Sequence, residues 1–382
     1  MIFSELALEL PGNPHPLYLL RDELKAQGSI ISDLVRGNPN EHSIIFPPDQ
    51  LRSILLAAAQ DAQVYRPDPF GQICARQAIS TYHKNTEIPA TQIVLTPGTS
   101  ISYWYCFKLL AEVGEEILCP QPSYPLLDYI ARFSGVKLTY YKLKEEKQWT
   151  LDLADLENKI SAKTRAIVLI SPHNPTGMVC SKKQVEELVC LARERDLPII
   201  ADEVFCDFIF EKEVLARPAE MDAPLVFSLN GLSKSYALAG MKLGWIGVSG
   251  YEWLVKRALN ALEILSDTFL PVSEISQFAA PRIFQEGSEF QQHYKDWVSA
   301  GRTLTLKILQ DFQFAAPQGG FYLTLPVEHD EEKLSQLILS EQKILVHPGH
   351  FYDIQGNHVV FTFVQEHKNL KGCLERLLPL LR

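Results

Sequence analysis

The sequence predicts an α/β protein in which a mostly parallel seven-stranded sheet with flanking helices is joined to a smaller α+β domain. From about Asp49 to Gly250, helical stretches alternate with short apolar runs rich in β-branched residues, a pattern typical of a parallel sheet covered by helices. After Tyr251 the helices become longer, and a glycine-rich turn at 318–320 precedes further short strands.

The length of the chain supports two domains, because 382 residues exceed one ordinary hydrophobic core. We expect an N-terminal arm over residues 1–45, a large domain over residues 46–265 and a small C-terminal domain over residues 266–382. The arm is expected to pack on the small domain, so that a cleft lies between the two domains.

Seven apolar runs bounded by glycine, proline or polar turns are expected to form the large sheet. They are Ile93–Thr96, Glu116–Cys119, Lys137–Tyr141, Ala166–Ser171, Pro198–Ala201, Leu225–Ser228 and Leu243–Val248. Ser181 and Gln184 make a capping box, which predicts a helix that runs to about Arg195. Short strands of the small domain are expected near Phe321–Leu325, Ile344–Val346 and Val359–Val364.

Composition narrows the partners and the compartment. The formal net charge is 36 − 46 = −10, so the chain has no general attraction for nucleic acid. The seven cysteines stand singly without a CxxC pair, which favours reduced thiols in a cytoplasm. The first twenty residues include Glu5 and Glu9 and lack a secretory pattern, and no apolar run approaches a membrane span. We expect a cytoplasmic protein with no nucleic-acid or membrane partner.

Two residues that follow predicted strands carry reactive groups. Lys234 lies just after the strand at Leu225–Ser228, where a lysine can meet a carbonyl cofactor that acts as an electron sink. Asp202 ends another apolar strand, and a carboxylate at this edge of a parallel sheet faces the ligand crevice. Taken alone, Asp202 is more often a helix cap, but the two residues together favour a cofactor site.

Two loops that follow strands complete the pattern. The segment Ser171–Gly177 is made rigid by its prolines and glycine, and could aim the Asn174 amide at a ring hydroxyl. In the second loop, Gly98 permits close approach of a ligand, while the Thr99 and Ser100 amides point at a phosphate at the helix start. An ordinary turn and an ordinary helix cap are the alternatives for the two loops.

These four motifs, in this order and with these gaps, resemble those of class I/II aminotransferases of pyridoxal-phosphate fold type I. The resemblance covers nearly the whole chain and includes the late segments 319–322 and 346–351. It implies pyridoxal 5′-phosphate as the cofactor, bound as a Schiff base by Lys234, and a ring-stacking aromatic at Tyr124. It also implies a homodimer in which Tyr65 reaches the neighbouring active site.

The sequence departs from the family pattern around the cofactor. Phe205 replaces a tyrosine three residues after the aspartate, which removes a hydrogen bond worth roughly 1.5–3 kcal/mol and leaves Asn174 as the main donor. Near the phosphate, Gly231 replaces a hydroxyl residue and Lys242 replaces an arginine. Lysine keeps the positive charge but cannot donate the two parallel hydrogen bonds of a guanidinium group. The residues expected to compensate are Ser233, Ser235, Thr99 and Tyr65.

A further departure concerns the substrate. Val360 falls on the position of the arginine that grips the substrate's α-carboxylate in the family. Binding a carboxylate without a fixed positive partner is costly, so another cation is expected. Arg36 is the candidate, because its neighbour Gly37 lies at the family's substrate turn. A register error of one residue or an unusual substrate are the alternatives.

Other motifs favour structural roles. Lys234-Ser235 lacks the glycine that precedes a P-loop lysine, and no GxGxxG follows a strand. His347 and His350 flank a Pro-Gly step with no carboxylate at metal-ligand spacing nearby, so no metal site is expected. Aromatic neighbours on a helix cannot all face one ligand, so core packing is expected for Tyr103, Trp104, Tyr105 and Phe107.

The function expected from these residues is transfer of an amino group between an amino acid and a 2-oxo acid. Lys234, once displaced by the substrate, acts as general acid and base, while Asp202 keeps the ring nitrogen positive. A carbon–sulfur β-lyase would use the same lysine and aspartate. A non-catalytic, cofactor-binding regulator is the second alternative, although no DNA-binding helix pair or basic arm precedes the domain.

Overall fold

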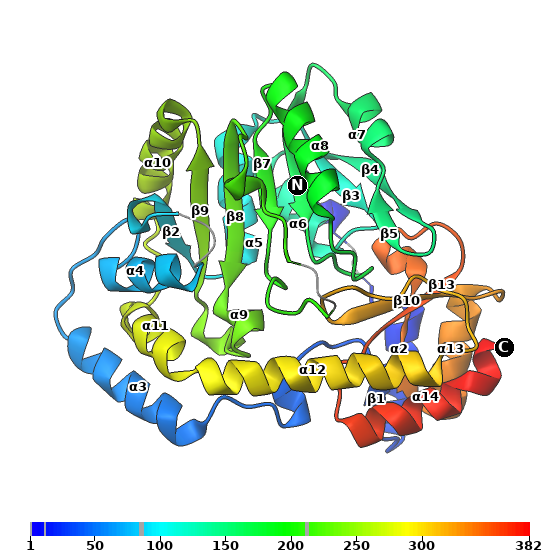
Figure 1. Cartoon of the computed structure of the whole chain (residues 1–382). Helices are drawn as coiled ribbons and strands as arrows, with labels where there is room; N and C mark the ends of the chain where they lie inside the picture. The colour runs from blue at the N-terminus through cyan, green and yellow to red at the C-terminus, as the bar shows by residue number, and fades with distance from the viewer. Residues whose placement is uncertain (1, 11–12, 84–87, 211–213) are drawn as a thin grey trace.

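The main sheet has eight strands in the order β2-β9-β8-β7-β6-β3-β4-β5 (Figure 1). The computed structural model describes residues 2–10, 13–83, 88–210 and 214–382. The strands are β2 (Ile93–Thr96), β3 (Glu116–Gln121), β4 (Lys137–Glu145), β5 (Trp149–Leu151), β6 (Thr164–Ile170), β7 (Ile199–Asp202), β8 (Leu225–Gly231) and β9 (Gly244–Gly250). All seven expected strands are present within a few residues of their predicted bounds. The eighth strand, β5, was not predicted.

Strand direction decides where the loops meet. Strands β3, β4, β6, β7 and β8 pair in parallel, whereas β9 is antiparallel to both β8 and β2. Strand β2 therefore runs in the same direction as β8. As a result, the segments that follow β2, β6, β7 and β8 leave the sheet at one edge, where open α/β sheets bind their ligands.

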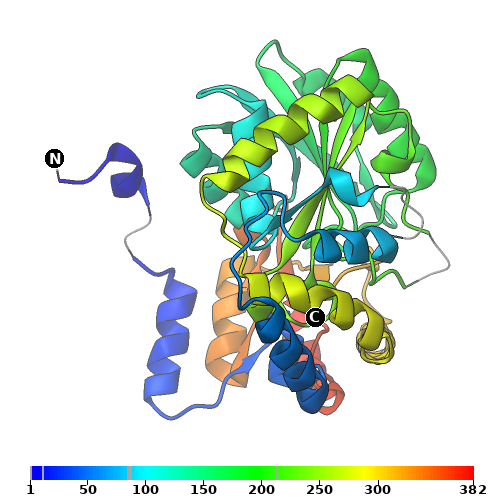
Figure 2. The ribbon, with the colours of Figure 1, turned by 90° about the vertical axis from the view of Figure 1, so that its left-hand side faces the viewer.

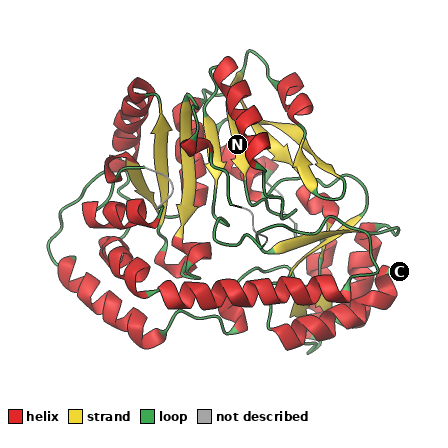
Figure 3. Cartoon of the chain, viewed as in Figure 1, coloured by secondary structure: helices red, strands yellow, loops and turns green. Residues whose placement is uncertain are grey.

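Helices cover both faces of the sheet (Figure 3). Its central strands β7 and β8 are buried throughout, and β6 is buried except at Arg165. One face packs against α5 (Thr99–Leu110), α6 (Leu126–Ser134) and α10 (Glu252–Asp267). The other face packs against α7 (Leu153–Lys159) and α8 (Lys182–Glu194). The capping box predicted at Ser181 and Gln184 is confirmed, since both of its hydrogen bonds are present at the start of α8.

Beyond the main sheet, three strands form a smaller antiparallel sheet in the order β10-β13-β12, and helices surround it. Its elements are β10 (Tyr322–Pro326), β12 (His347–Pro348), β13 (His358–Thr362), α13 (Glu331–Gln342), the 3-10 helix η5 (Gly349–Tyr352) and α14 (His367–Leu381). Helix α11 (Glu274–Glu286) contacts three further helices, which are α3 (Pro48–Asp61), α4 (Ile73–Tyr82) and α12 (Ser288–Ile308).

The strand expected near Ile344–Val346 is confirmed over Ile344–Leu345, but the short strand β12 that follows it was not predicted. The chain forms β11 (Ile344–Leu345), which pairs in parallel with β1 (Ser32–Asp33), and then leaves that sheet to join β13 as β12. Val346 lies where the chain changes partners.

The N-terminal segment extends away from the body and returns to it (Figure 2). It contains α1 (Glu5–Glu9) and α2 (Pro16–Ala26). Leu17 and Leu24 of α2 are buried against Leu339 of α13 and Leu345 of β11. The pairing of β1 with β11 continues this contact, so α2 and β1 are both held against the last third of the chain.

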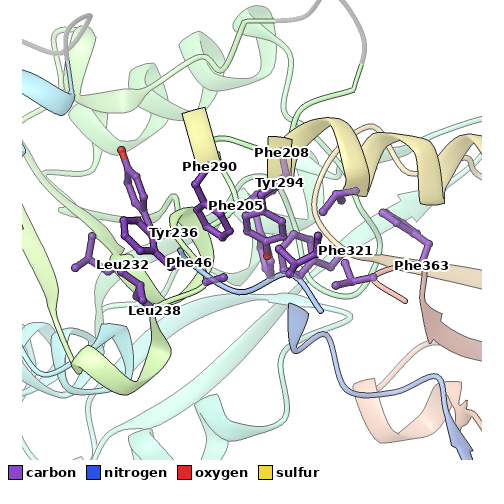
Figure 4. Packing of buried hydrophobic residues seen from close by; sticks show 14 of the residues in the cluster. Phe46, Phe205, Phe208, Leu232, Tyr236, Leu238, Phe290, Tyr294, Phe321 and Phe363 are labelled. Atoms are coloured by element: carbon purple, nitrogen blue, oxygen red, sulfur yellow. The ribbon is translucent and has the colours of Figure 1, made fainter. Parts of the chain in front are cut away.

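Aromatic side chains fill the core between the main sheet and α12 (Figure 4). The rings of Phe205, Phe208, Tyr294 and Phe321 meet edge to face, with centroids 4.7–6.2 Å apart. Such contacts add to the stabilisation from burial and hold each ring in one orientation. Among the described residues, no helix combines the length and the apolar character that crossing a bilayer requires.

Candidate active site

A cavity of about 160 Å³ lies at the edge of the main sheet where β2, β6, β7 and β8 end. Its walls come from the strand-end segments and from α5, α6 and β10. They consist of Gly98, Thr99, Ser100, Tyr103, Tyr124, Leu127, Ile130, Ile170, Asn174, Asp202, Val204, Phe205, Gly231, Ser233, Lys234 and Tyr322.

Lys234 contributes an amine to this cavity. It lies in the short helix α9 (Leu232–Ser235), which begins directly after β8. Its Nζ is 5.7 Å from the ring centroids of both Phe205 and Phe321, and no carboxylate among the described residues pairs with it. Burial lowers the pKa of Lys234 below its ordinary value. A lysine in this setting is more readily deprotonated, and a neutral amine is the nucleophilic form.

Asp202 contributes a buried carboxylate. Its Oδ1 accepts a hydrogen bond of 3.0 Å from the Val204 backbone N–H, and its Oδ2 accepts one of 2.8 Å from the Tyr103 hydroxyl. Burial raises the pKa of Asp202, while these two donors oppose that rise. The carboxylate has no cationic partner among the described residues, and it is available to a positively charged ring nitrogen.

The loop that carries Asn174 is held by the last third of the chain. The carbonyl of Gly177 accepts backbone hydrogen bonds from Gln318 and Gly319, at 2.8 and 2.9 Å. Gly177 has φ +68°, and a Cβ at this position would lie 2.3 Å from Pro317 Cβ. Asn174 Oδ1 is buried without a hydrogen-bond partner among the described residues, so the amide has unused capacity beside the cavity.

The start of α5 forms one end of the cavity. Gly98 is its N-cap residue, with φ +133° and no side chain to cap the helix, and Thr99 and Ser100 follow on the cavity wall. Uncapped amides at a helix start favour an anion. A Cβ on Gly98 would lie 3.8 Å from Lys242 Nζ, so the Lys242 ammonium adds positive charge at the same end.

Four other expected residues lie off the wall of this cavity. Ser235 was expected to help hold the phosphate, but its hydroxyl donates to the Gly231 carbonyl at 2.9 Å and stabilises α9 instead. Tyr65 is 68% exposed and lies in a separate hollow beside Pro271. Gly37 is outside the wall but packs against Tyr322, whose hydroxyl would be 2.9 Å from a Cβ on that glycine.

Arg36 is the fourth of these residues. Its side chain is 60% exposed and lies 3.6 Å from Asp33 and 3.6 Å from Glu41. Val360, at the family's arginine position, is buried in an apolar cluster that includes Trp149 and Tyr352. In the part of the chain that the structure describes, Lys234 is therefore the only basic side chain on the cavity wall.

Two tyrosines of the wall were not expected at the site. Tyr103 packs in the core as expected, and its hydroxyl in addition donates to Asp202. Helix periodicity could have shown which residues share its face, but not that this face meets a ligand. Tyr322 follows the expected glycine turn at 319–320, and burial raises its pKa to about 12, so its hydroxyl stays protonated and can donate.

Comparison with known proteins agrees with this geometry. The model of the family described as aminotransferase class I and II matches residues 38–377. A glutamate-pyruvate aminotransferase of Haemophilus influenzae is 29% identical over 85% of this chain and 84% of the relative. An aspartate aminotransferase of Sulfolobus acidocaldarius is 28% identical over 98% and 96%. Among solved structures, an alanine aminotransferase from Pyrococcus furiosus superposes with a TM-score of 0.91 at 26% identity, covering 99% of each chain. As the ordered motifs predicted, the chain belongs to the class I and II aminotransferases.

Proposed function

We propose that this aminotransferase binds pyridoxal 5′-phosphate in the cavity and that Lys234 Nζ forms the covalent bond to its aldehyde carbon. One observation carries the proposal: a half-buried lysine without a counterion among the described residues shares a cavity wall with a buried carboxylate and an uncapped helix start. These groups fit an aromatic aldehyde with a basic ring nitrogen at one end and a phosphate at another. The unpaired Asn174 amide fits its ring hydroxyl.

Most polar groups on the wall have a proposed partner on the cofactor. The start of α5, at Thr99 and Ser100, would hold the phosphate together with Ser233 and the Lys242 ammonium. Asp202 would pair with the ring nitrogen and keep it protonated. The remaining ring contacts are proposed for Tyr124, Asn174 and Phe205.

When bound, the cofactor supplies a protonated ring that accepts electron density from the carbon next to the substrate nitrogen. Besides binding the cofactor, Lys234 would act as general base and acid. Its free amine would take the proton from the substrate Cα and deliver it to the former aldehyde carbon of the cofactor. Its lowered pKa favours this role at neutral pH.

The proposed substrates are an amino acid and a 2-oxo acid, as the names of the relatives suggest. With Val360 at the family's arginine position, the carboxylate needs other donors. We assign it to Gly37 and the protonated Tyr322 hydroxyl, with Arg36 as the mobile cation. Arg36 can turn towards a substrate, because its side chain is exposed and its two ion pairs, each 3.6 Å long, are weak.

A homodimer is proposed from one face of the chain. An apolar groove of about 470 Å³ there includes the exposed Phe133 and Phe269, and it shares Ser100 and Ile130 with the cavity wall. Pro271 borders both this groove and the hollow of Tyr65. A second copy seated on the groove would cover it and bring its Tyr65 face next to the first cavity.

The domain limits of 1–45, 46–265 and 266–382 are likewise proposed, with the cofactor held mainly by the second. Cytoplasmic location is proposed because all seven cysteines are free thiols in the described structure.

The function is tested by turnover of purified protein with a panel of amino donors and 2-oxo acids. We expect amino transfer with at least one pair, and its loss in Lys234→Ala. Pyruvate release without any acceptor would instead support the β-lyase. Cofactor binding without turnover of any donor, acceptor or sulfur-containing amino acid would contradict catalysis.

A further inference from the structure

Three side chains from distant parts of the chain converge outside the active site. They are His15, which caps the start of α2, Glu332 in the first turn of α13, and His350 in η5. One ligand atom from each lies within 4.8 Å of the others. Glu332 Oε2 is 3.7 Å from His15 Nε2 and 3.6 Å from His350 Nε2. Two ligands on one tetrahedral zinc ion lie roughly 3.4 Å apart, so the spacing suits a shared ion.

A second carboxylate orients His350 for this role. Glu331 Oε1 is 2.8 Å from His350 Nδ1, which places the proton of a neutral ring on Nδ1 and leaves the Nε2 lone pair facing Glu332. Glu331 is itself fixed, because it also accepts backbone hydrogen bonds from Gly349, His350 and His358. A carboxylate that holds the far nitrogen of a histidine is the usual outer partner of a metal ligand.

The other ligands are also held in place. The ring of Phe351 meets both imidazoles edge to face, with centroids 4.6 Å from His15 and 5.0 Å from His350. Glu332 Oε1 accepts from the Gln336 amide, whereas Oε2 is buried without a hydrogen-bond donor. A buried carboxylate oxygen without a partner is costly, and a cation between the two imidazoles would remove that cost.

We propose that His15, Glu332 and His350 bind a divalent transition metal of the zinc class, with a fourth position open to water. This differs from the expectation of no metal site, which rested on the absence of a carboxylate near His350 in the sequence. Two imidazoles and one carboxylate favour zinc over calcium or magnesium, which prefer ligand sets made of oxygen.

Metal binding changes one existing contact. His15 Nδ1 accepts a hydrogen bond of 3.3 Å from the Leu17 backbone N–H. When Nε2 binds a metal, the proton of the neutral ring moves to Nδ1, and Nδ1 can no longer accept this hydrogen bond at the start of α2. A metal–nitrogen bond replaces it.

The site would fasten the N-terminal segment to the small sheet. It lies next to a contact chain in which His347 bonds to the Tyr18 hydroxyl at 2.6 Å and to the Tyr352 hydroxyl at 3.0 Å. The Tyr352 carbonyl accepts from the Ser123 N–H at 2.9 Å, one residue before Tyr124 on the cavity wall. The metal would thus hold the start of α2 against α13 and η5.

The test measures zinc bound to the chelator-treated, cofactor-loaded enzyme. The variants are His15→Gln, Glu332→Gln and His350→Gln, and His329→Gln is the control because that exposed histidine lies outside the site. We expect one zinc per chain in the wild type and the control, a higher Tm with zinc but not with magnesium, and at least a 10-fold loss of affinity in each site variant. X-ray absorption should report two imidazole ligands.

Two results would overturn the proposal. If the wild type binds no zinc at micromolar concentration, the cluster is only an ion-pair network. If all three variants retain zinc with wild-type affinity, the metal binds elsewhere. Circular dichroism of each variant separates loss of the ligand from loss of the fold, and Glu332→Gln, which keeps the shape of the side chain, is the decisive variant should a histidine variant unfold.

Discussion

The Tyr103 hydroxyl donates a hydrogen bond of 2.8 Å to Asp202 Oδ2 inside the core of the protein. Tyr103 lies on α5, the helix whose start is proposed to hold the phosphate, and Asp202 ends β7. Because burial raises the pKa of Asp202, the hydroxyl counteracts desolvation and favours the charged carboxylate. A single helix thus links the two ends of the proposed cofactor site.

Replacing Tyr103 with phenylalanine should raise the pKa of Asp202 and weaken its hold on the ring nitrogen. A hydrogen bond to a charged group contributes roughly 1.5–3 kcal/mol, so kcat/KM should fall by about 10-fold to 100-fold. The acidic limb of the pH–rate profile should also move to higher pH, which a merely structural defect would not cause.

The matched control is Tyr141→Phe. Tyr141 is equally buried and donates a 2.7 Å hydrogen bond to the Val168 carbonyl, but it lies off the cavity wall. It should lose stability without a shift in the pH profile. Equal profiles for the two variants would refute the role given to Tyr103.

The stability of the cofactor-free protein should depend on pH through Lys234. Because burial lowers the pKa of Lys234 below 10.5, the unfolded chain binds an extra proton between the folded pKa and 10.5. The free energy of unfolding therefore rises with pH across that window. Below the folded pKa of Lys234, the folded protein bears the whole penalty of burying a charged amine. Each tenfold increase in the acidity constant of the buried amine corresponds to about 1.4 kcal/mol of this penalty.

Lys234→Met removes this penalty, so the variant should gain most stability at neutral pH and progressively less towards pH 10.5. Urea denaturation of both proteins across that range measures the difference. Lys256→Met, at an exposed position on α10, should run parallel to the wild type. A constant difference between Lys234→Met and the wild type would show that the amine is not desolvated.

The Asn174 loop should depend on glycine at position 177. Alanine there would face a positive φ and a Cβ 2.3 Å from Pro317, so we expect a loss of about 1–3 kcal/mol in the free energy of unfolding. Cofactor affinity should fall as well, since the same loop carries Asn174. Gly372→Ala in α14 meets no atom within 4 Å and should be neutral or stabilising. Equal stability of the two variants would argue against a strained, fastened loop.

Arg36→Ala tests the proposed carboxylate partner. Loss of a charge-assisted contact should raise KM for the 2-oxo acid by about 10-fold to 100-fold, with a smaller change in kcat. Arg52→Ala is the control, because Arg52 is also exposed and ion-paired, with Asp49 at 2.8 Å, but lies on α3. An unchanged KM would assign the carboxylate to Gly37 and Tyr322 alone.

The sequence predicted the main sheet because its strands are local, apolar and rich in β-branched residues. It missed β5, since three residues become a strand only by pairing with β4. It also missed β12, because nothing in the apolar run at Ile344–Val346 indicates that the chain changes sheets after it. Pairing partners are tertiary information, and periodicity does not contain them.

The strand-end residues expected at the site do line one cavity, because parallel strands end at the same edge. The failures involve contacts between distant segments. Tyr103 reaches Asp202 across 99 positions, and His15 meets His350 from the opposite end of the chain. Ser235 was expected at the phosphate, whereas its hydroxyl donates to the Gly231 carbonyl at the start of its own helix, an alternative that the sequence does not distinguish.

The central claim is the covalent role of Lys234, and peptide mass spectrometry after borohydride reduction of the cofactor-loaded protein tests it most directly. The account predicts one modified peptide, which carries the reduced cofactor on Lys234 and disappears in Lys234→Ala. A label on Lys242, or no label on a folded protein saturated with pyridoxal 5′-phosphate, would contradict it.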